Sequence, residues 1–238
     1  MTDKDLDFLV ECDNEQLKTL VDILVFDSDG KRRMSESLSA TKLFAECYPS
    51  HLKPLLPAII NEIQLFGGNS IVNKLRGHGV PYREILEDVC DRLKVNYSKK
   101  LSVELLESEL LRKVAVTAID KMSDEDIKKF DENLDRTRLL DTIMNGNGAI
   151  IMAISAVIIS QFTKQVGKGA VMLFGRVLAP RVLAFAVPVL NVAAAIWTAF
   201  DIASPAYRVT IPFAITTAFL RRTLNSAQDS ETFSKLFS

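Results

Sequence analysis

The sequence predicts an all-α protein, a multi-helix bundle with a hydrophobic helical hairpin in its C-terminal part. In the front of the chain, apolar residues recur at the three- and four-residue spacing of amphipathic helices. No stretch alternates apolar and polar residues between hairpin turns, as a half-buried β-strand would. Three runs without charge follow, between Thr142 and Leu220. The composition therefore divides the chain into an acidic soluble helical domain, 1–144, and a hydrophobic, basic helical region, 145–238.

Four helices of the front are expected from their apolar faces and their caps. The first follows a capping box of Asp13 and Gln16 and carries Leu17, Leu20, Val21 and Leu24 on one face. The second begins near Pro81, a residue suited to a first helical turn, and its apolar face is Tyr82, Ile85, Leu86, Val89, Cys90 and Leu93. The third runs from an N-cap at Ser102 to Met122, with a stripe of Leu106, Leu110, Val114, Ala118 and Met122. The fourth runs from Ser123 to about Met144.

The tail holds two uncharged runs long enough to cross a bilayer. There are 22 uncharged residues between Asp141 and Lys164, and 19 between Arg181 and Asp201, within the range of roughly 17 to 25 that a spanning helix needs. Residues 149–159 are apolar at nearly every position, so that helix must be covered on all sides. The residues predicted to interact with a membrane are Ile150, Ile151, Ile154, Val157, Ile158, Phe185, Val189 and Trp197.

Charge divides the chain in the same way. Residues 142–238 contain eight basic and three acidic residues, a net charge of +5, which leaves −6 for the front and −1 for the whole chain. A basic, apolar tail suits an anionic lipid surface, where each basic residue adds about 1 kcal/mol. The alternative is a pair of core helices whose few charges reach solvent.

The sequence shows no recognisable catalytic, metal-binding or nucleotide-binding motif. The three cysteines lie 35 and 43 residues apart, and the two histidines stand outside any triad or HExxH motif. There is no Walker or GxGxxG loop. We therefore expect no enzymatic activity, no metal and no cofactor, and the acidic front disfavours nucleic acid. The cysteines are expected to be reduced and mostly buried.

One basic cluster predicts an anion or partner site. Two glycine-rich segments, 67–70 and 77–79, each precede a predicted helix, and helix N-termini bind anions. The residues predicted to form this site are Lys74, Arg76, His78 and Arg83. The alternative is that the glycines make tight corners, with Arg76 and His78 on helix-end carbonyls.

Three blocks of sequence carry a resemblance to a known family. The central block runs from Phe66 to Gly79 and continues to Lys94; the others are Asp5–Leu9 with Cys12, and Ala206–Pro212 before Leu220-Arg221-Arg222. In these blocks the chain resembles the YaaW family of uncharacterised bacterial proteins. The resemblance implies a bacterial protein without a settled biochemical activity. It also implies a looser likeness of the central block to ubiquinol–cytochrome c chaperones.

These observations favour a non-enzymatic membrane-associated helical protein, in which membrane insertion or pore formation is one hypothesis. The alternatives are a chaperone-like adaptor for assembly of a membrane protein complex and a soluble protein of unknown activity with a buried hydrophobic hairpin. The N-terminus lacks the basic and apolar segments of a signal peptide, so we expect a cytoplasmic protein at the inner membrane. Its partners are expected to be membrane lipids or a membrane protein, and it could form a homo-oligomer.

Overall fold

The computed structural model describes residues 3–27, 29–67, 79–130, 135–145, 148–162 and 206–236. Over these residues the regular elements are helices without a β-strand, which confirms the predicted all-α class. In chain order they are η1 (Lys4–Glu11), α1 (Asn14–Val25), η2 (Leu38–Ala40), α2 (Lys42–Cys47), η3 (Lys53–Leu55), α3 (Leu56–Gly67), α5 (Tyr82–Arg92), α6 (Val103–Lys121), α7 (Asp124–Phe130), α8 (Arg136–Met144), α9 (Gly148–Phe162) and α13 (Tyr207–Leu236).

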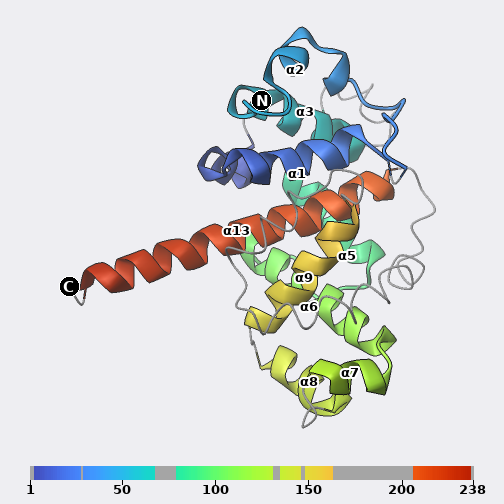
Figure 1. The fold of residues 1–238 in the computed structure, drawn as a ribbon, viewed down its shortest axis with the longest axis vertical. Helices are drawn as coiled ribbons and strands as arrows, with labels where there is room; N and C mark the ends of the chain where they lie inside the picture. Colours follow the sequence, from blue (N-terminus) through green and yellow to red (C-terminus); the bar gives the residue numbers. More distant parts are fainter. Residues whose placement is uncertain are drawn as a thin grey trace.

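The helix α13 lies at the centre of the bundle, although it comes last in the chain. Figure 1 shows it passing between α1 on one side and α5, α6 and α9 on the other, and it also contacts α3. Every residue from Val209 to Leu220 is buried, so this uncharged run forms the middle of the hydrophobic core. The C-terminal end of α13 projects beyond the other helices (Figure 1).

The helix α1 forms as its cap and apolar face predict. The Gln16 backbone N–H donates to Asp13 Oδ1 at 2.9 Å, and the Asp13 N–H donates to Gln16 Oε1 at 2.8 Å, which completes the capping box. The four apolar residues of its predicted face are fully buried. A capped N-terminus and one apolar face therefore fix both where α1 begins and how it packs against α13.

The helices α5 and α6 also follow their sequence signals. All six residues of the predicted α5 face and all five of the predicted α6 stripe are buried. Ser102 Oγ accepts from the Leu105 N–H at 3.4 Å and caps α6, while Pro81 stands one residue before α5. Both predictions are confirmed, and these two helices form one wall around α13.

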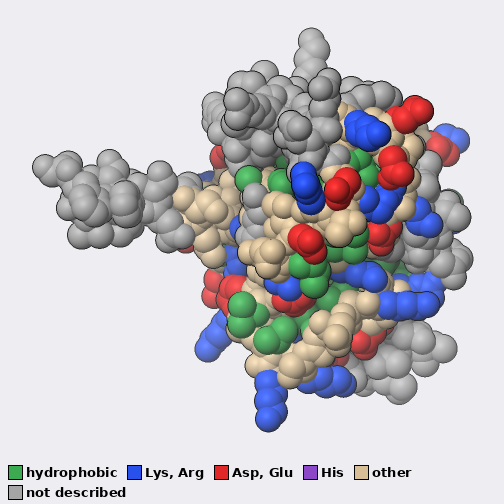
Figure 2. All heavy atoms as spheres, turned by 90° about the horizontal axis from the view of Figure 1, so that it is seen from below, with side chains coloured by type: hydrophobic (Ala, Val, Ile, Leu, Met, Phe, Trp, Pro, Cys, Tyr) green, Lys and Arg blue, Asp and Glu red, His purple; other side chains and the backbone are tan. Residues whose placement is uncertain are grey.

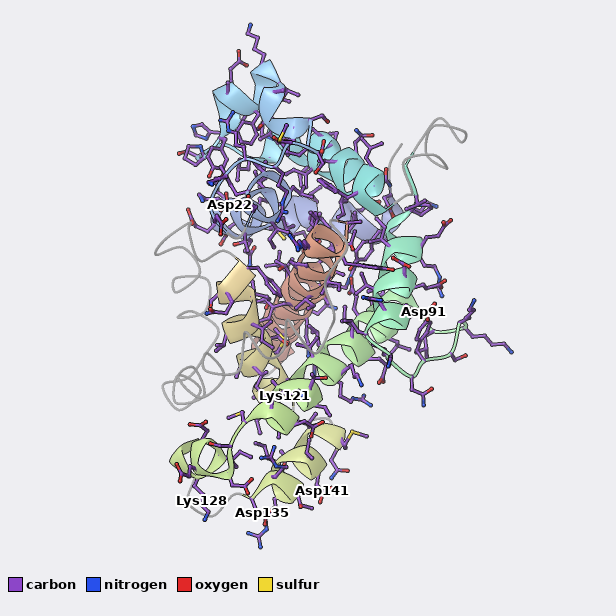
Figure 3. The ribbon with its side chains drawn as sticks, turned by 90° about the vertical axis from the view of Figure 1, so that its right-hand side faces the viewer. Asp22, Asp91, Lys121, Lys128, Asp135 and Asp141 are labelled. Atoms are coloured by element: carbon purple, nitrogen blue, oxygen red, sulfur yellow. The ribbon has the colours of Figure 1, made fainter. Side chains whose placement is uncertain are left out.

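The predicted helix from Ser123 to about Met144 is wrong as a single element. The structure has α7 and α8 instead, because Asp135 is extended and its carboxylate accepts the Arg138 N–H at 2.8 Å as a new N-cap. The Arg136 guanidinium next to this cap donates to the backbone carbonyls of Ile119 and Met122 at the end of α6. This contact turns α8 back toward α6. The end of the bundle that α7 and α8 form is seen in Figure 3.

One hydrophobic core includes residues from both sides of the boundary predicted at residues 144 and 145. The tail helices α9 and α13 both pack on α6, and α13 also packs on α1, α3 and α5. The division into 1–144 and 145–238 stays a prediction about composition. In the part of the chain that the structure describes, the tail helices share their core with the front helices.

The three cysteines are free and buried, as expected. Burial raises the pKa of the Cys12 thiol from 9.0 to about 12, and it raises the pKa of Cys90 equally. A folded-state pKa raised above the unfolded value contributes stability that is complete below the unfolded pKa and lost as pH rises. The window of loss is therefore between pH 9 and about 12.

We predict that the free energy of unfolding falls steeply as pH rises above 9. Each thiol that ionises only in the unfolded chain adds a slope of about 1.4 kcal/mol per pH unit. Urea unfolding at a series of alkaline pH values measures the slope. The matched control is the Cys12→Ala, Cys90→Ala variant, which should lose less stability over the same window. Parallel pH profiles for the two proteins would contradict the prediction.

Candidate functional site

The helix α9 is the described part of the predicted membrane segment. Its residues from Ile151 to Ile159 are all buried, and Ile150 is half-buried. The predicted membrane residues Ile151, Ile154, Val157 and Ile158 therefore lie inside the bundle. Phe185, Val189 and Trp197 lie outside the described residues.

Other helices of the same chain cover α9. It packs against α6, α8 and α13 (Figure 1), so the bundle supplies the cover that an all-round apolar helix requires. Its one polar residue in the buried stretch, Ser155, donates to the Ile151 carbonyl at 2.8 Å. The buried Ser155 hydroxyl therefore needs no hydrogen-bond partner from outside the helix. The other buried side chains of α9 are apolar.

By length and hydropathy, none of the described helices qualifies singly as a transmembrane span. The pair formed by Arg136–Met144 and Gly148–Phe162 passes the same criteria together, but its two halves meet at a bend of 105°.

A buried ion pair lies in the middle of the bundle, between α6 and α13. Arg221 Nε donates to Glu107 Oε2 at 2.6 Å, and Arg221 Nη2 reaches Glu107 Oε1 at 3.4 Å. The Arg221 and Glu107 side chains are only 10% and 3% exposed. Because a buried charge without a partner is costly, the pair holds the two helices in one register.

Groups from two further elements complete the coordination of this pair. Tyr82 of α5 donates its hydroxyl to Glu107 Oε1 at 2.9 Å. Arg221 Nη2 also donates to the backbone carbonyl of Asp5 in η1, and its guanidinium lies 4.0 Å from the centroid of the Phe8 ring. The ion pair therefore connects four elements, α5, α6, α13 and η1.

A second buried carboxylate extends the network toward α3. Asp3 Oδ2 accepts the Tyr82 backbone N–H at 2.7 Å and the Gln64 side-chain amide at 2.9 Å. The Tyr82 N–H belongs to the first turn of α5, so Asp3 caps a helix that is remote in sequence. The N-terminal segment is thereby fixed to α3 and α5.

Burial perturbs the titration of this network. It raises the pKa of Tyr82 well above its usual value, and the Glu107 charge adds to the rise. Burial also raises the pKa of Glu107, an effect that Arg221 opposes. For Arg221, burial lowers the pKa, but Glu107 outweighs it and the net direction is upward. The arginine therefore stays charged and the tyrosine stays a hydrogen-bond donor.

The predicted anion cluster is only partly within the described residues. Lys74, Arg76 and His78 lie outside them. Arg83 is on α5, where its Nε donates to Glu87 at 3.0 Å and its Nη2 donates to the Lys99 carbonyl at 2.9 Å. These bonds hold the 94–102 loop against α5, and Arg83 has a structural use that the sequence did not predict. The cluster as an anion site stays a prediction.

The described part of the chain holds no candidate metal centre. No three His, Cys, Asp or Glu side chains gather there in a way that could hold a metal ion. The Arg221–Glu107 pair was not predicted from the sequence. Its signal was Arg221 itself, the first charge after 12 uncharged residues of a buried helix.

We predict that Arg221→Met lowers the free energy of unfolding by about 3 to 5 kcal/mol, because it leaves the Glu107 carboxylate buried without its guanidinium. The Glu107→Leu, Arg221→Met double variant removes both charges and should lose less than the sum of the two single variants. Urea unfolding of the three variants measures this coupling. Arg138→Met, at a side chain that is 68% exposed, is the control and should change stability by less than about 0.5 kcal/mol. Additive losses would show that the pair is not coupled.

Comparison with known proteins identifies relatives over almost the whole chain. A "UPF0174 protein" of Helicobacter pylori strain J99 is 34% identical, covering 96% of this chain and 95% of the relative. The "UPF0174 protein YaaW" of Escherichia coli strain K12 is also 34% identical, covering 96% and 98%. Neither name states an activity.

A comparison with family models and a comparison with solved structures give less information about this chain. A family model described as "Domain of unknown function (DUF3944)" matches residues 1–34, the segment that contains η1 and α1. No solved structure matches this chain. The identity and the near-complete coverage of the relatives are sufficient on their own: the chain belongs to the UPF0174 family of bacterial proteins, the family of YaaW.

Proposed function

We propose that this protein is a non-enzymatic, membrane-associating helical protein that shelters an apolar segment inside its own bundle. The observation that supports the proposal is α9, which is apolar on every side and buried from Ile151 to Ile159. An ordinary surface helix of a bundle keeps one polar face. A helix without such a face is suited to two surroundings, a protein core and a lipid bilayer.

The length of α9 limits how it would enter lipid. Its 15 residues rise about 22 Å, which is less than the roughly 30 Å of a bilayer's hydrocarbon core. Insertion across the membrane would therefore need the second uncharged run, 182–200, as well. The alternative mode is insertion of α9 into one leaflet.

The charge distribution supports an anionic membrane surface as the partner. The tail carries +5 and the front −6, so the apolar segment belongs to the end of the chain that anionic lipids attract. The face at the α7 and α8 end carries interspersed acidic and basic side chains with small apolar patches (Figure 2).

We propose that the protein is located in the cytoplasm at the inner membrane. Its partner there would be lipid or a membrane protein, and assembly of several copies is a further part of the proposal.

Two other functions would use the same bundle differently. A permanent core role for α9 would leave the protein with some other activity and no affinity for lipid. A chaperone-like adaptor would bind a membrane-protein client without inserting its own helices. A measurement of how deeply the protein enters the bilayer distinguishes both alternatives from our proposal.

We predict that Trp197, the one tryptophan of the chain, is quenched by brominated acyl chains when the full-length protein is mixed with acidic vesicles. Bromine quenches only fluorophores within the hydrocarbon region, so quenching reports insertion and not surface binding. A Trp197→Phe, Ile150→Trp variant reports on α9 in the same way, because Ile150 is at a half-buried position near its start. Flotation of the same samples measures binding separately.

The control places the reporter on the front of the molecule. Met34 is fully exposed, so a Trp197→Phe, Met34→Trp variant should float with vesicles but escape quenching. Absence of flotation for all three proteins would rule out membrane association. Flotation without quenching of Trp197 or of the Ile150→Trp variant would rule out insertion and favour an adaptor on the surface.

A further inference from the structure

Two hydroxyl groups lie inside the core without a hydrogen-bond partner among the residues that the structure describes. They belong to Thr216 and Thr217, in the uncharged run of α13, and these residues are 1% and 0% exposed. A buried polar group without a partner lowers the ratio of folded to unfolded protein by a factor of about 5 to 30. Native proteins contain few such groups, so two neighbouring ones at the centre of a bundle need a physical explanation.

Other helical threonines of this protein satisfy their hydroxyls within their own helix. In each of them Oγ1 donates to the backbone carbonyl four residues earlier, at 2.7 to 3.3 Å. These residues are Thr19, Thr117, Thr142, Thr210 and Thr223. The equivalent acceptors for Thr216 and Thr217 are the carbonyls of Pro212 and Phe213, and those two bonds are not formed.

The packing of the core accounts for the difference. A threonine in a helix has two common χ1 conformations, and only some conformations direct the hydroxyl at the preceding carbonyl. A fully buried side chain cannot change conformation without displacing its neighbours. The bundle as the structure shows it, which we call the closed bundle, therefore holds both hydroxyls in conformations that leave them unpaired.

The two hydroxyls lie where most of the helices meet. The helix α13 contacts α1, α3, α5, α6 and α9 (Figure 1), and every residue from Val209 to Leu220 is buried. Pro212 lies in the same run, and a proline inside a helix removes one backbone hydrogen bond. An unfavourable free energy at this position therefore acts on the whole bundle and not on one pair of helices.

We propose that Thr216 and Thr217 form a conformational device that sets how readily the bundle opens. Once the helices separate, each hydroxyl can rotate toward a carbonyl of its own helix or bond to water. Opening thus gains hydrogen bonds that the closed bundle lacks. The closed bundle is less stable than one with apolar side chains of the same shape at these two positions, and the opening equilibrium is shifted toward the open state.

The device adds a means of regulation to the proposed function. Release of α9 requires that its contacts with α6, α8 and α13 separate, and the two unpaired hydroxyls lower the free energy that this separation needs. This regulatory part rests on the proposed membrane association. The opening equilibrium does not, because it is a property of the protein in solution.

The test measures the opening equilibrium of the full-length protein by native-state hydrogen exchange at the amides of α9 and α13. Thr216→Val and Thr217→Val replace each hydroxyl by a methyl group and keep the β-branched shape. Each variant should lower the opening equilibrium constant by about fivefold or more, because an unpaired polar group leaves the core. Opening constants equal to or larger than that of the wild type would overturn the proposal.

The matched control is Thr210→Val, in the same helix. Thr210 is 2% exposed, but its hydroxyl donates to the Ala206 carbonyl at 3.3 Å. The control should leave the opening constant unchanged or raise it, because it removes an existing hydrogen bond. A decrease as large as that of the other two variants would assign the effect to the added methyl group and would also overturn the proposal.

A second pair of variants covers the case in which valine overpacks the core. Thr216→Ala and Thr216→Ser both remove the Cγ2 methyl group, and only Thr216→Ser keeps the hydroxyl. Thr216→Ala should have the lower opening constant, by a larger factor than the same two substitutions give at Thr210. An equal factor at both positions would reflect helix propensity alone and would count against the proposal.

A further arm measures the regulation of membrane insertion. The wild type and the two valine variants are mixed with acidic vesicles, and quenching of Trp197 by brominated acyl chains is followed over time. The valine variants should insert more slowly, by the factor found for their opening constants. Insertion at the wild-type rate despite a lowered opening constant would overturn the regulatory part. If the wild type does not float with vesicles, the proposed function fails alone, because the exchange measurement uses no lipid.

Discussion

The burial of α13 is the constraint on which the rest of the structure depends. Its uncharged run from Val209 to Leu220 is surrounded by α1, α3, α5, α6 and α9, and Arg221 ends that run inside the bundle. The carboxylate of Glu107 supplies the opposite charge that a guanidinium buried at this position needs. The ion pair thus fixes where α13 sits along α6. The packing of α9 follows, because α9 contacts both helices.

This arrangement explains how the apolar helix α9 and the uncharged run of α13 are accommodated within a bundle. The amphipathic helices α1, α5 and α6 turn their apolar faces inward, and the all-round apolar helices occupy the space between them. The same apolar surface that stabilises the core is the surface that would favour lipid. Membrane association, as we propose it, would exchange helix contacts of α9 for acyl chains, and an equilibrium of that kind is governed by the stability of the surrounding bundle.

Much of the fold could be predicted from local signals, but the site could not. The capping box at Asp13 and the face that starts at Tyr82 depend on neighbours in the sequence, so periodicity found them. Glu107 and Arg221 are 114 residues apart, and no local pattern indicates that they meet. Arg221 and Arg222 differ by one helical step, about 100°, which sends one into the core and the other toward Gly148. The break at Asp135 was not predicted, because Asp135 was not recognised as a second N-cap in the segment that follows Ser123.

The central claim is that α9 and α13 belong to one cooperative core with the front helices. Hydrogen exchange of the native protein tests it most directly, because amides of a shared core exchange only through global unfolding. The account predicts that amides of Ile154 and Phe213, both fully buried, show the same free energy of opening as those of Leu20 in α1. Exchange of α9 and α13 at a much lower opening free energy than α1 would contradict it, because the tail would then open independently of the front.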